Sequence, residues 1–410
     1  MLMLAACREK ESSRAKVITL FPIATASHLK RHAYIIVAPI RMGFLSPSLE
    51  CLISKMSKGS NGNSSKEVIA APAEPRPLNW DETRERQLKL KRQLWRNMVG
   101  NTIFIEARNL AHIIGCERVY LKFEGSNPTG TQKDRIAMVL ADQAVIKGSE
   151  GIATATCGNF GVALAYAAKH YDIPAHIFIP KRYEVPKDRQ KRMENFGARV
   201  YLVDGYYEDA VTYASKVADE NHWYNANPGY NGVPEMSLTA YSEIAFEIFR
   251  DLRRVPDYVF CPVGNGTTIA GIFAGFKKLY ATGKIIELPQ MVATSTRRGN
   301  PIVASFKANS RVLVDLKPEE IRESEVNEPL TNWHSFDGQL ALDALFESGG
   351  FGEYASDSKM LEFSKVVRSE EGLSVLPASA STLAVMETLA RDGFIIKGTF
   401  VAVLTGRDFD

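Results

Sequence analysis

The sequence lacks the features that mark membrane proteins and nucleic-acid-binding proteins. Its 410 residues contain no apolar run long enough to cross a bilayer, and the longest N-terminal candidates are interrupted by Arg, Lys and His. Its 50 basic and 47 acidic side chains leave a formal charge of only +3, too small to favour nucleic acid or membrane partners. We therefore expect a small-molecule partner.

Cysteine and histidine are scarce and scattered. The five cysteines are odd in number and show no CxxC spacing, which argues against a disulfide framework or structural zinc and favours a reducing compartment. The seven histidines lack ligand-like spacing, so we expect no metal site. We expect a cytoplasmic location, or an organelle if the N-terminal stretch is a transit peptide.

The first 75 residues differ from the rest of the chain. Residues 1–55 are basic and poor in acids, and residues 56–75 are rich in Ser, Gly, Asn and Pro. Three interpretations of residues 1–55 stay open: an organelle transit peptide, a tail, or translated upstream sequence before a true start at Met56. We expect residues 1–75 to be a disordered extension outside the fold.

From about Leu78 the pattern becomes regular and is typical of an α/β protein. A charged helix over 80–96 precedes short β-rich runs that alternate with helical stretches. DYVFCPV and TFVAVLT are apolar on both faces, as a sheet covered by helices on both sides requires, and ligands bind at the carboxyl ends of such strands. The predicted strands are 118–124, 151–156, 175–180, 199–203, 257–263, 290–295 and 399–405.

The segment FEGSNPTGTQKDRIA follows a predicted strand and opens a predicted helix. Residues 127–130 make a turn, so Lys133 falls in the first helical turn. The positive end of the helix dipole disfavours an ammonium there and favours the neutral amine, the form that condenses with an aldehyde. A solvated lysine beside Asp134 and Arg135 is the alternative.

The segment ATATCGNFGVALAYAAKHY runs from a strand through a turn of small residues into an Ala-rich helix. The backbone amides from Thr156 to Asn159 would point outward at the helix start, which suits a carboxylate. An ordinary N-terminal cap of a core helix would explain the same pattern.

A glycine loop lies in CPVGNGTTIAGIFAGF. Gly264 and Gly266 let the backbone approach an anion, as in a phosphate-binding nest. Thr267 and Thr268 add hydroxyls. A dinucleotide site would need an acidic residue at the end of the next strand, whereas Glu287 precedes the strand QMVATS, so the pattern favours a single phosphate.

The last predicted strand, TFVAVLT, ends at Thr405 and is followed by Gly406. A hydroxyl where a buried strand reaches the edge of a sheet could contact a ring nitrogen. A capping threonine before a turn is the alternative.

Together these segments resemble the fold-type II pyridoxal phosphate enzymes, and most closely the threonine synthase branch. NPTGTQKDR is similar to the family's NPTG-S-x-KDR, TCGNFG to its S/T-G-N-T/S turn, PVGNGTTIAG to its phosphate loop and LTG to its closing T-G. VGNTIFIEARNL looks like its G-N-T-P-L opening, and LPASASTLA is similar to its E-P-A-S-A segment. The matches follow the family's order over roughly residues 97–410.

The resemblance implies an α/β fold of two domains, each a mostly parallel open twisted sheet flanked by helices, with the cofactor in the cleft between them. Residues 76–130 plus 240–410 would form the large domain. Residues 131–239 would form the small domain, which carries the Schiff-base lysine and the asparagine turn. The family also implies a homodimer that acts on a small amino-acid substrate.

The resemblance also implies a role for each motif residue around pyridoxal 5'-phosphate. Lys133 would form the Schiff base and move protons at the substrate's α and β carbons. Asn159 would hydrogen-bond the cofactor's 3-hydroxyl, and Thr405 would face its pyridine nitrogen. The cofactor's phosphate would be held by Gly264, Asn265, Gly266, Thr267 and Thr268. The substrate carboxylate pocket would be lined by Thr156, Cys157, Gly158 and Phe160.

A hydroxyl partner leaves the pyridine nitrogen largely unprotonated, which disfavours transamination and racemisation and favours elimination and replacement. In threonine synthase, as the resemblance implies, a lyase reaction converts O-phospho-L-homoserine and water to L-threonine and phosphate.

Several residues depart from the family's pattern and leave the substrate open. Phe160 stands where the family has Thr or Ser, so a hydroxyl donor to the substrate carboxylate is lost. Cys157 replaces Ser or Thr, and Gln132 replaces a common Phe. KDRIA and GNT are also similar to cysteine synthases. Three hypotheses follow: a threonine synthase, an enzyme of β-replacement or β-elimination on serine-like substrates, and a pyridoxal phosphate-binding protein without turnover.

Overall fold

The computed structural model describes residues 80–156, 158–181, 187–205, 207–230, 232–395 and 397–409. They fall within one compact unit, Arg76–Asp410. The expected extension 1–75 and the site candidate Cys157 lie outside the described residues. Within the described residues no helix is both long and apolar enough to cross a membrane.

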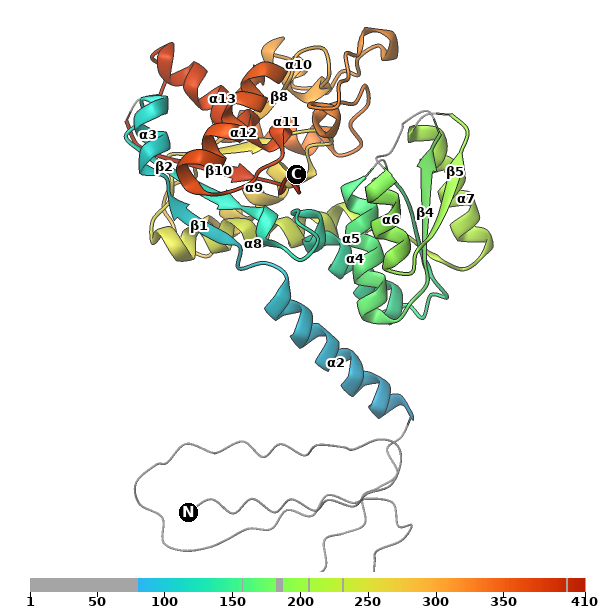
Figure 1. Cartoon of the computed structure of the whole chain (residues 1–410). Coiled ribbons are helices and arrows are strands. Elements are labelled where there is room, and N and C mark those ends of the chain that lie inside the picture. The colour runs from blue at the N-terminus through green and yellow to red at the C-terminus, as the bar shows by residue number, and fades with distance from the viewer. Residues whose placement is uncertain are drawn as a thin grey trace, which may run out of the picture. The chain divides into compact units, whose positions relative to one another are not determined.

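The unit contains two sheets (Figure 1). The larger has the order β1-β2-β10-β7-β8-β9, in which β1 pairs antiparallel with β2 and every other neighbour is parallel. Its strands are β1 (Ile103–Glu106), β2 (Arg118–Phe123), β7 (Tyr258–Pro262), β8 (Gln290–Thr296), β9 (Phe351–Ala355) and β10 (Thr399–Leu404). The smaller is all parallel in the order β5-β4-β3-β6, with β3 (Ile152–Ala155), β4 (Ala175–Pro180), β5 (Arg199–Val203) and β6 (Tyr224–Asn225).

Helices cover both sheets. Those that precede β7 are α2 (Trp80–Met98), α3 (Arg108–Ile114), α4 (Lys133–Ile146), α5 (Asn159–Tyr171), α6 (Lys187–Asn195), α7 (Tyr207–Glu220) and α8 (Val233–Leu252). Those that follow it are α9 (Thr267–Ala281), α10 (Pro301–Lys307), α11 (Gly338–Glu347), α12 (Asp357–Glu371) and α13 (Pro377–Arg391). Three short 3-10 turns are η1 (Glu124–Ser126), η2 (Pro318–Glu320) and η3 (Glu328–Leu330).

The central strand β10 shows why the larger sheet needs helices on both faces. All six of its residues are buried. Val401 and Val403 pack in one core, with residues of α8, α9 and α11. Phe400 and Leu404 pack in a second core, with residues of α3, α12 and α13. Successive side chains of a strand point to opposite faces, so a strand that is apolar throughout requires two apolar layers.

Helix α8 packs closely on α9 and also contacts α4, so it joins the helices of the two sheets. The close approach depends on small residues of α9. A Cβ atom added at Gly271 would lie 2.5 Å from the Cβ of Tyr241, and one added at Gly275 would lie 2.6 Å from the carbonyl oxygen of Ser242. A side chain at either position would force the two helices apart.

The α/β fold class predicted from the sequence is confirmed, and all seven predicted strands are present within two residues of their predicted bounds. Strands β1, β6 and β9 were not predicted; β6 has only two residues, and Gly352 and Glu353 interrupt the apolar pattern of β9. The division into domains at residues 130 and 239 stays a prediction. Its second boundary falls inside α8.

Candidate active site

Residues from both sheets line one cavity of about 310 Å³. It lies at the carboxyl ends of three parallel strands, because Ala155 of β3, Pro262 of β7 and Thr405 after β10 all contribute to its wall. The described site residues predicted from four separate segments also line it: Lys133, Thr156, Gly158, Asn159, Phe160, Gly264, Asn265, Gly266, Thr267, Thr268 and Thr405.

Lys133 is the first residue of α4 and is partly buried. Burial lowers the pKa of its amine, against an opposing effect of the charges of Asp337 and Cys261. Its Nζ lies 5.9 Å from the centre of the Tyr241 ring. The backbone before it is tied to the end of β10, since the Gln132 amide donates to the carbonyl oxygen of Thr405 over 3.0 Å. This lysine therefore combines a backbone held in place with an amine whose pKa is lowered by burial.

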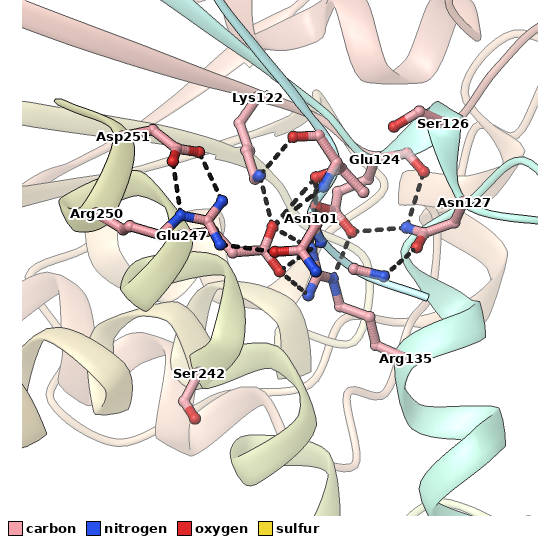
Figure 2. A network of polar contacts seen from close by, with 12 residues as sticks. Asn101, Lys122, Glu124, Ser126, Asn127, Arg135, Ser242, Glu247, Arg250 and Asp251 are labelled. Atoms are coloured by element: carbon pink, nitrogen blue, oxygen red, sulfur yellow. Dashed lines mark hydrogen bonds and ion pairs between the residues drawn. The ribbon is translucent and has the colours of Figure 1, made fainter. Parts of the chain in front are cut away.

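Asp134 and Arg135, the two residues after Lys133, are buried, with exposed fractions of 0% and 4%. Asp134 accepts hydrogen bonds from the backbone amide and the hydroxyl of Thr129, at 2.8 and 2.6 Å. The Arg135 side chain points into a buried cluster of charged residues (Figure 2). Its guanidinium donates to both oxygens of Glu124 and both oxygens of Glu247.

The second cation of this cluster is Lys122 of β2. Lys122, with no exposed area, donates to Glu247 Oε2 over 2.6 Å and to the carbonyl oxygen of Thr102. Glu124 also accepts from the Thr102 hydroxyl and from the Asn127 side chain. Two cations and two carboxylates thus neutralise one another at the junction of β2, α4 and α8.

Helix α5 begins at Asn159, with Gly158 as its N-cap. The Gly158 amide donates to Thr156 Oγ1 over 3.1 Å. A Cβ atom added at Gly158 would lie 2.5 Å from Nη1 of Arg189, so this guanidinium rests directly against the turn. Phe160 is partly buried and also lines the cavity.

The glycine loop opens α9, and Gly266 is its N-cap in the left-handed region, with φ of 84°. The loop is held by neighbouring amides, because Asn300 donates to the carbonyl oxygen of Gly264 and Asn332 donates to Asn265 Oδ1, at 2.9 and 3.0 Å. The Thr267 hydroxyl donates to Asp337 Oδ2 over 2.7 Å. Burial raises the pKa of Asp337, although the hydrogen bond from Thr267 and the charge of Lys133 oppose this.

Thr405 forms a hydrogen bond with a second hydroxyl that lines the cavity. Its hydroxyl lies 3.0 Å from the hydroxyl of Ser379, which also accepts from the backbone amide of Gly406 over 3.0 Å. Ser379 is buried at the start of α13 and lines the cavity. It lies in the LPASASTLA segment, so the resemblance in that segment was a usable signal.

Acidic residues form a further wall that the motifs did not indicate. None of the sequence motifs falls in residues 310–329, yet the cavity is lined there by Pro318, Ile321, Glu323, Glu328 and Pro329. Burial and the charge of Glu328 raise the pKa of Glu323 to about 7. Burial also raises the pKa of Glu328, while the charge of Arg189 opposes this rise.

These residues fit pyridoxal phosphate. An aldehyde condenses with a neutral amine, and the burial of Lys133 shifts its amine towards that form. A phosphate dianion is suited by the backbone amides at the start of a helix, which α9 offers beside two hydroxyls. The hydroxyl pair of Ser379 and Thr405 suits an uncharged ring nitrogen. Among the described residues, no group of three or more His, Cys, Asp or Glu could hold a metal ion.

Comparison with known proteins places the chain in a family. The family model "Pyridoxal-phosphate dependent enzyme" matches residues 96–406. The threonine synthase of Methanocaldococcus jannaschii is 32% identical over 309 residues, covering 75% of this chain and 74% of that protein. The threonine synthase of Methanosarcina acetivorans is 31% identical over 310 residues, covering 75% of this chain and 74% of that protein.

Solved structures agree in fold at lower sequence identity. Maize serine racemase superposes with a TM-score of 0.64 and 17% identity, covering 79% of this chain and 93% of that chain. Diaminopropionate ammonia lyase from Escherichia coli superposes with a TM-score of 0.64 and 18% identity, covering 80% of this chain and 90% of that chain. The cofactor expected from the sequence is confirmed, and the chain belongs to the fold-type II pyridoxal phosphate-dependent enzymes.

Proposed function

We propose that this enzyme is a lyase of the threonine synthase type, which converts O-phospho-L-homoserine and water to L-threonine and phosphate. The observation that carries the proposal is the meeting of Lys133, the start of α9 and Thr405 at one cavity in a chain that is 32% identical to a threonine synthase. We also propose that each motif residue has the role that the family resemblance implies for it.

The chemistry divides between the cofactor and the chain. Pyridoxal phosphate, when bound, supplies an electron sink for the substrate's α carbon. Lys133 takes a proton from that carbon and serves as acid and base at the β carbon, and burial, which lowers its pKa, favours the neutral form that acts as a base. The amides and hydroxyls at the start of α9 bind the cofactor's phosphate, and Asn159 binds its 3-hydroxyl. Thr405 offers a hydroxyl to the ring nitrogen, which favours elimination over transamination.

A second candidate is β-replacement or β-elimination on serine-like substrates, and the acidic wall favours it. Glu208, Glu323 and Glu328 line the cavity, and these side chains repel the phosphate ester of phosphohomoserine when they are ionised. A serine-like substrate with a neutral leaving group would not meet this repulsion. Phe160 removes one hydroxyl from the carboxylate pocket in either case.

The two candidates differ in the substrate that is turned over. The full chain, purified with pyridoxal phosphate, is assayed for phosphate and threonine from O-phospho-L-homoserine, and for pyruvate or thioether products from serine, phosphoserine and O-acetylserine. We expect threonine, and we expect both product and yellow absorbance to vanish in Lys133→Ala. Lys147→Ala, at the exposed end of the same helix, is the matched control and should retain both.

Turnover of serine-like substrates with none of phosphohomoserine would replace the first candidate by the second. Binding of pyridoxal phosphate without turnover of any of these amino acids would refute both.

We also propose the assembly and organisation that the family resemblance implies. The enzyme would be a cytoplasmic homodimer, with residues 131–239 as a small domain and residues 76–130 plus 240–410 as a large one. Light scattering on the purified chain measures the mass in solution, and a value near that of one 45.5 kDa chain would contradict the dimer.

A further inference from the structure

Arg189 of α6 lies at the turn where we place the substrate carboxylate. Its Nη1 would be 2.5 Å from a Cβ atom added at Gly158, so no side chain fits between the guanidinium and the turn. Gly158 is the N-cap of α5, and both it and Arg189 line the cavity. A charged fork and the amides of a helix start therefore border the same space.

Arg189 is held by a carboxylate from the larger sheet's side of the cavity. Its Nη1 lies 3.6 Å from Glu328 Oε2, and the two side chains are 20% and 27% exposed. Glu328 begins η3, which follows β8 along the chain, whereas α6 lies between β4 and β5. At 3.6 Å the pair is longer than a charge-assisted hydrogen bond of 2.7–2.9 Å. It is thus a loose ion pair that another anion can replace.

Among the described residues that line the cavity, Arg189 is the positively charged side chain that is available to bind an anionic group of the substrate. Lys133 and Arg189 are the basic residues in the described part of the wall, and we assign Lys133 to the cofactor under the proposed function. Phe160 lines the same cavity and offers no hydroxyl donor. A guanidinium replaces such a donor well, because its two parallel N–H groups match the two oxygens of a carboxylate.

We propose that Arg189 binds the α-carboxylate of the amino-acid substrate, and that Glu328 is the counter-ion which this carboxylate displaces. The proposal rests on the proposed function only in that the substrate is an amino acid. Arg189 is then a specificity-determining residue, and it supplies the anion contact that Phe160 cannot make.

The test measures binding rather than turnover. The absorbance of the pyridoxal phosphate-loaded protein is titrated with L-threonine and L-serine, and with the amide of each, which lacks the carboxylate charge. We expect the wild type to bind the acids more tightly, and Arg189→Gln to reduce this preference about 10- to 100-fold, as the loss of a charge-assisted bidentate contact predicts. Lys191→Gln, an exposed neighbour on α6 with the same change of charge, should keep it.

A second variant separates recognition from mere support of the fold. Glu328→Gln removes the competing anion, so the acids should bind about two- to fivefold more tightly, whereas a structural ion pair would give weaker binding. An unchanged acid-to-amide ratio in Arg189→Gln, or weaker acid binding in Glu328→Gln, would overturn the proposal.

The remaining outcomes separate this proposal from the proposed function. If Arg189→Gln keeps the acid-to-amide preference but no longer distinguishes phosphohomoserine from homoserine, Arg189 binds a distal phosphate and the proposal is wrong. If no amino acid changes the wild-type spectrum, the proposed function fails and this proposal fails with it.

Discussion

Replacing Glu247 by Gln should destabilise the fold by about 3 kcal/mol. Burial raises the pKa of Glu247, but hydrogen bonds and charges of Arg135 and Lys122 outweigh it and lower the pKa from 4.5 to about 2. At about 1.4 kcal/mol per pKa unit this gives roughly 3 kcal/mol at neutral pH. Removal of one partner of a buried ion pair typically destabilises a protein by about 3–5 kcal/mol, which agrees with this value.

The sign of the pH dependence follows from the lowered pKa. A carboxyl group whose pKa is lower in the folded state stabilises the fold above the unfolded value and loses this contribution as pH falls through the folded value. The stability gap between wild type and Glu247→Gln should therefore be full at pH 7 and shrink as pH falls from about 4.5 towards 2.

Urea unfolding of the cofactor-free chain, followed by circular dichroism at pH 7 and at pH 4, measures the gap. Glu243→Gln is the matched control, because Glu243 is exposed one turn earlier on α8 and should change the free energy of unfolding by less than about 0.5 kcal/mol. Equal stability of the two variants, or a gap that widens on acidification, would refute the reasoning.

Three further predictions concern the cavity. Asp337→Asn should tighten pyridoxal phosphate binding about three- to tenfold, because a carboxylate bound to Thr267 repels a phosphate at the start of α9; equilibrium dialysis showing an unchanged Kd contradicts this. Lys133→Met should stabilise the cofactor-free chain by about 0.5–2 kcal/mol at pH 7 in urea unfolding, since burial penalises the ammonium, and a loss of stability counts against it. Ser379→Ala should cost about 1–3 kcal/mol in the same assay, because Thr405 and a backbone amide lose their partner; a change within 0.5 kcal/mol speaks against that role.

The sequence predicted those parts of the fold and site that are local in the chain. Strands β4 and β5 were predicted with their observed bounds, because each is a short apolar run between helices. The glycine loop and the lysine turn were also recognisable, since each motif contains both the end of a strand and the start of a helix.

The remaining site residues are brought to the cavity by the fold. Arg189 and Glu328 are 139 positions apart (328 − 189), and neither belongs to a motif, yet they meet at 3.6 Å. Hydrophobic periodicity says which face of an element is buried, but it does not say which distant polar side chains share a space. The acidic wall could therefore not be predicted, and Ser379 was the exception because it lies in a recognised segment.

The start of α4 explains how the chain tolerates an unfavourable lysine. An ammonium at Lys133 is opposed both by burial and by the helix dipole, so the helix start must be held by other contacts. The next two residues provide them. Asp134 binds the preceding turn through Thr129, and Arg135 joins the buried charge cluster. Lys133 thus reaches the cavity, while Asp134 binds the preceding turn and Arg135 binds the charge cluster. The contacts of these two buried side chains hold the backbone that carries Lys133.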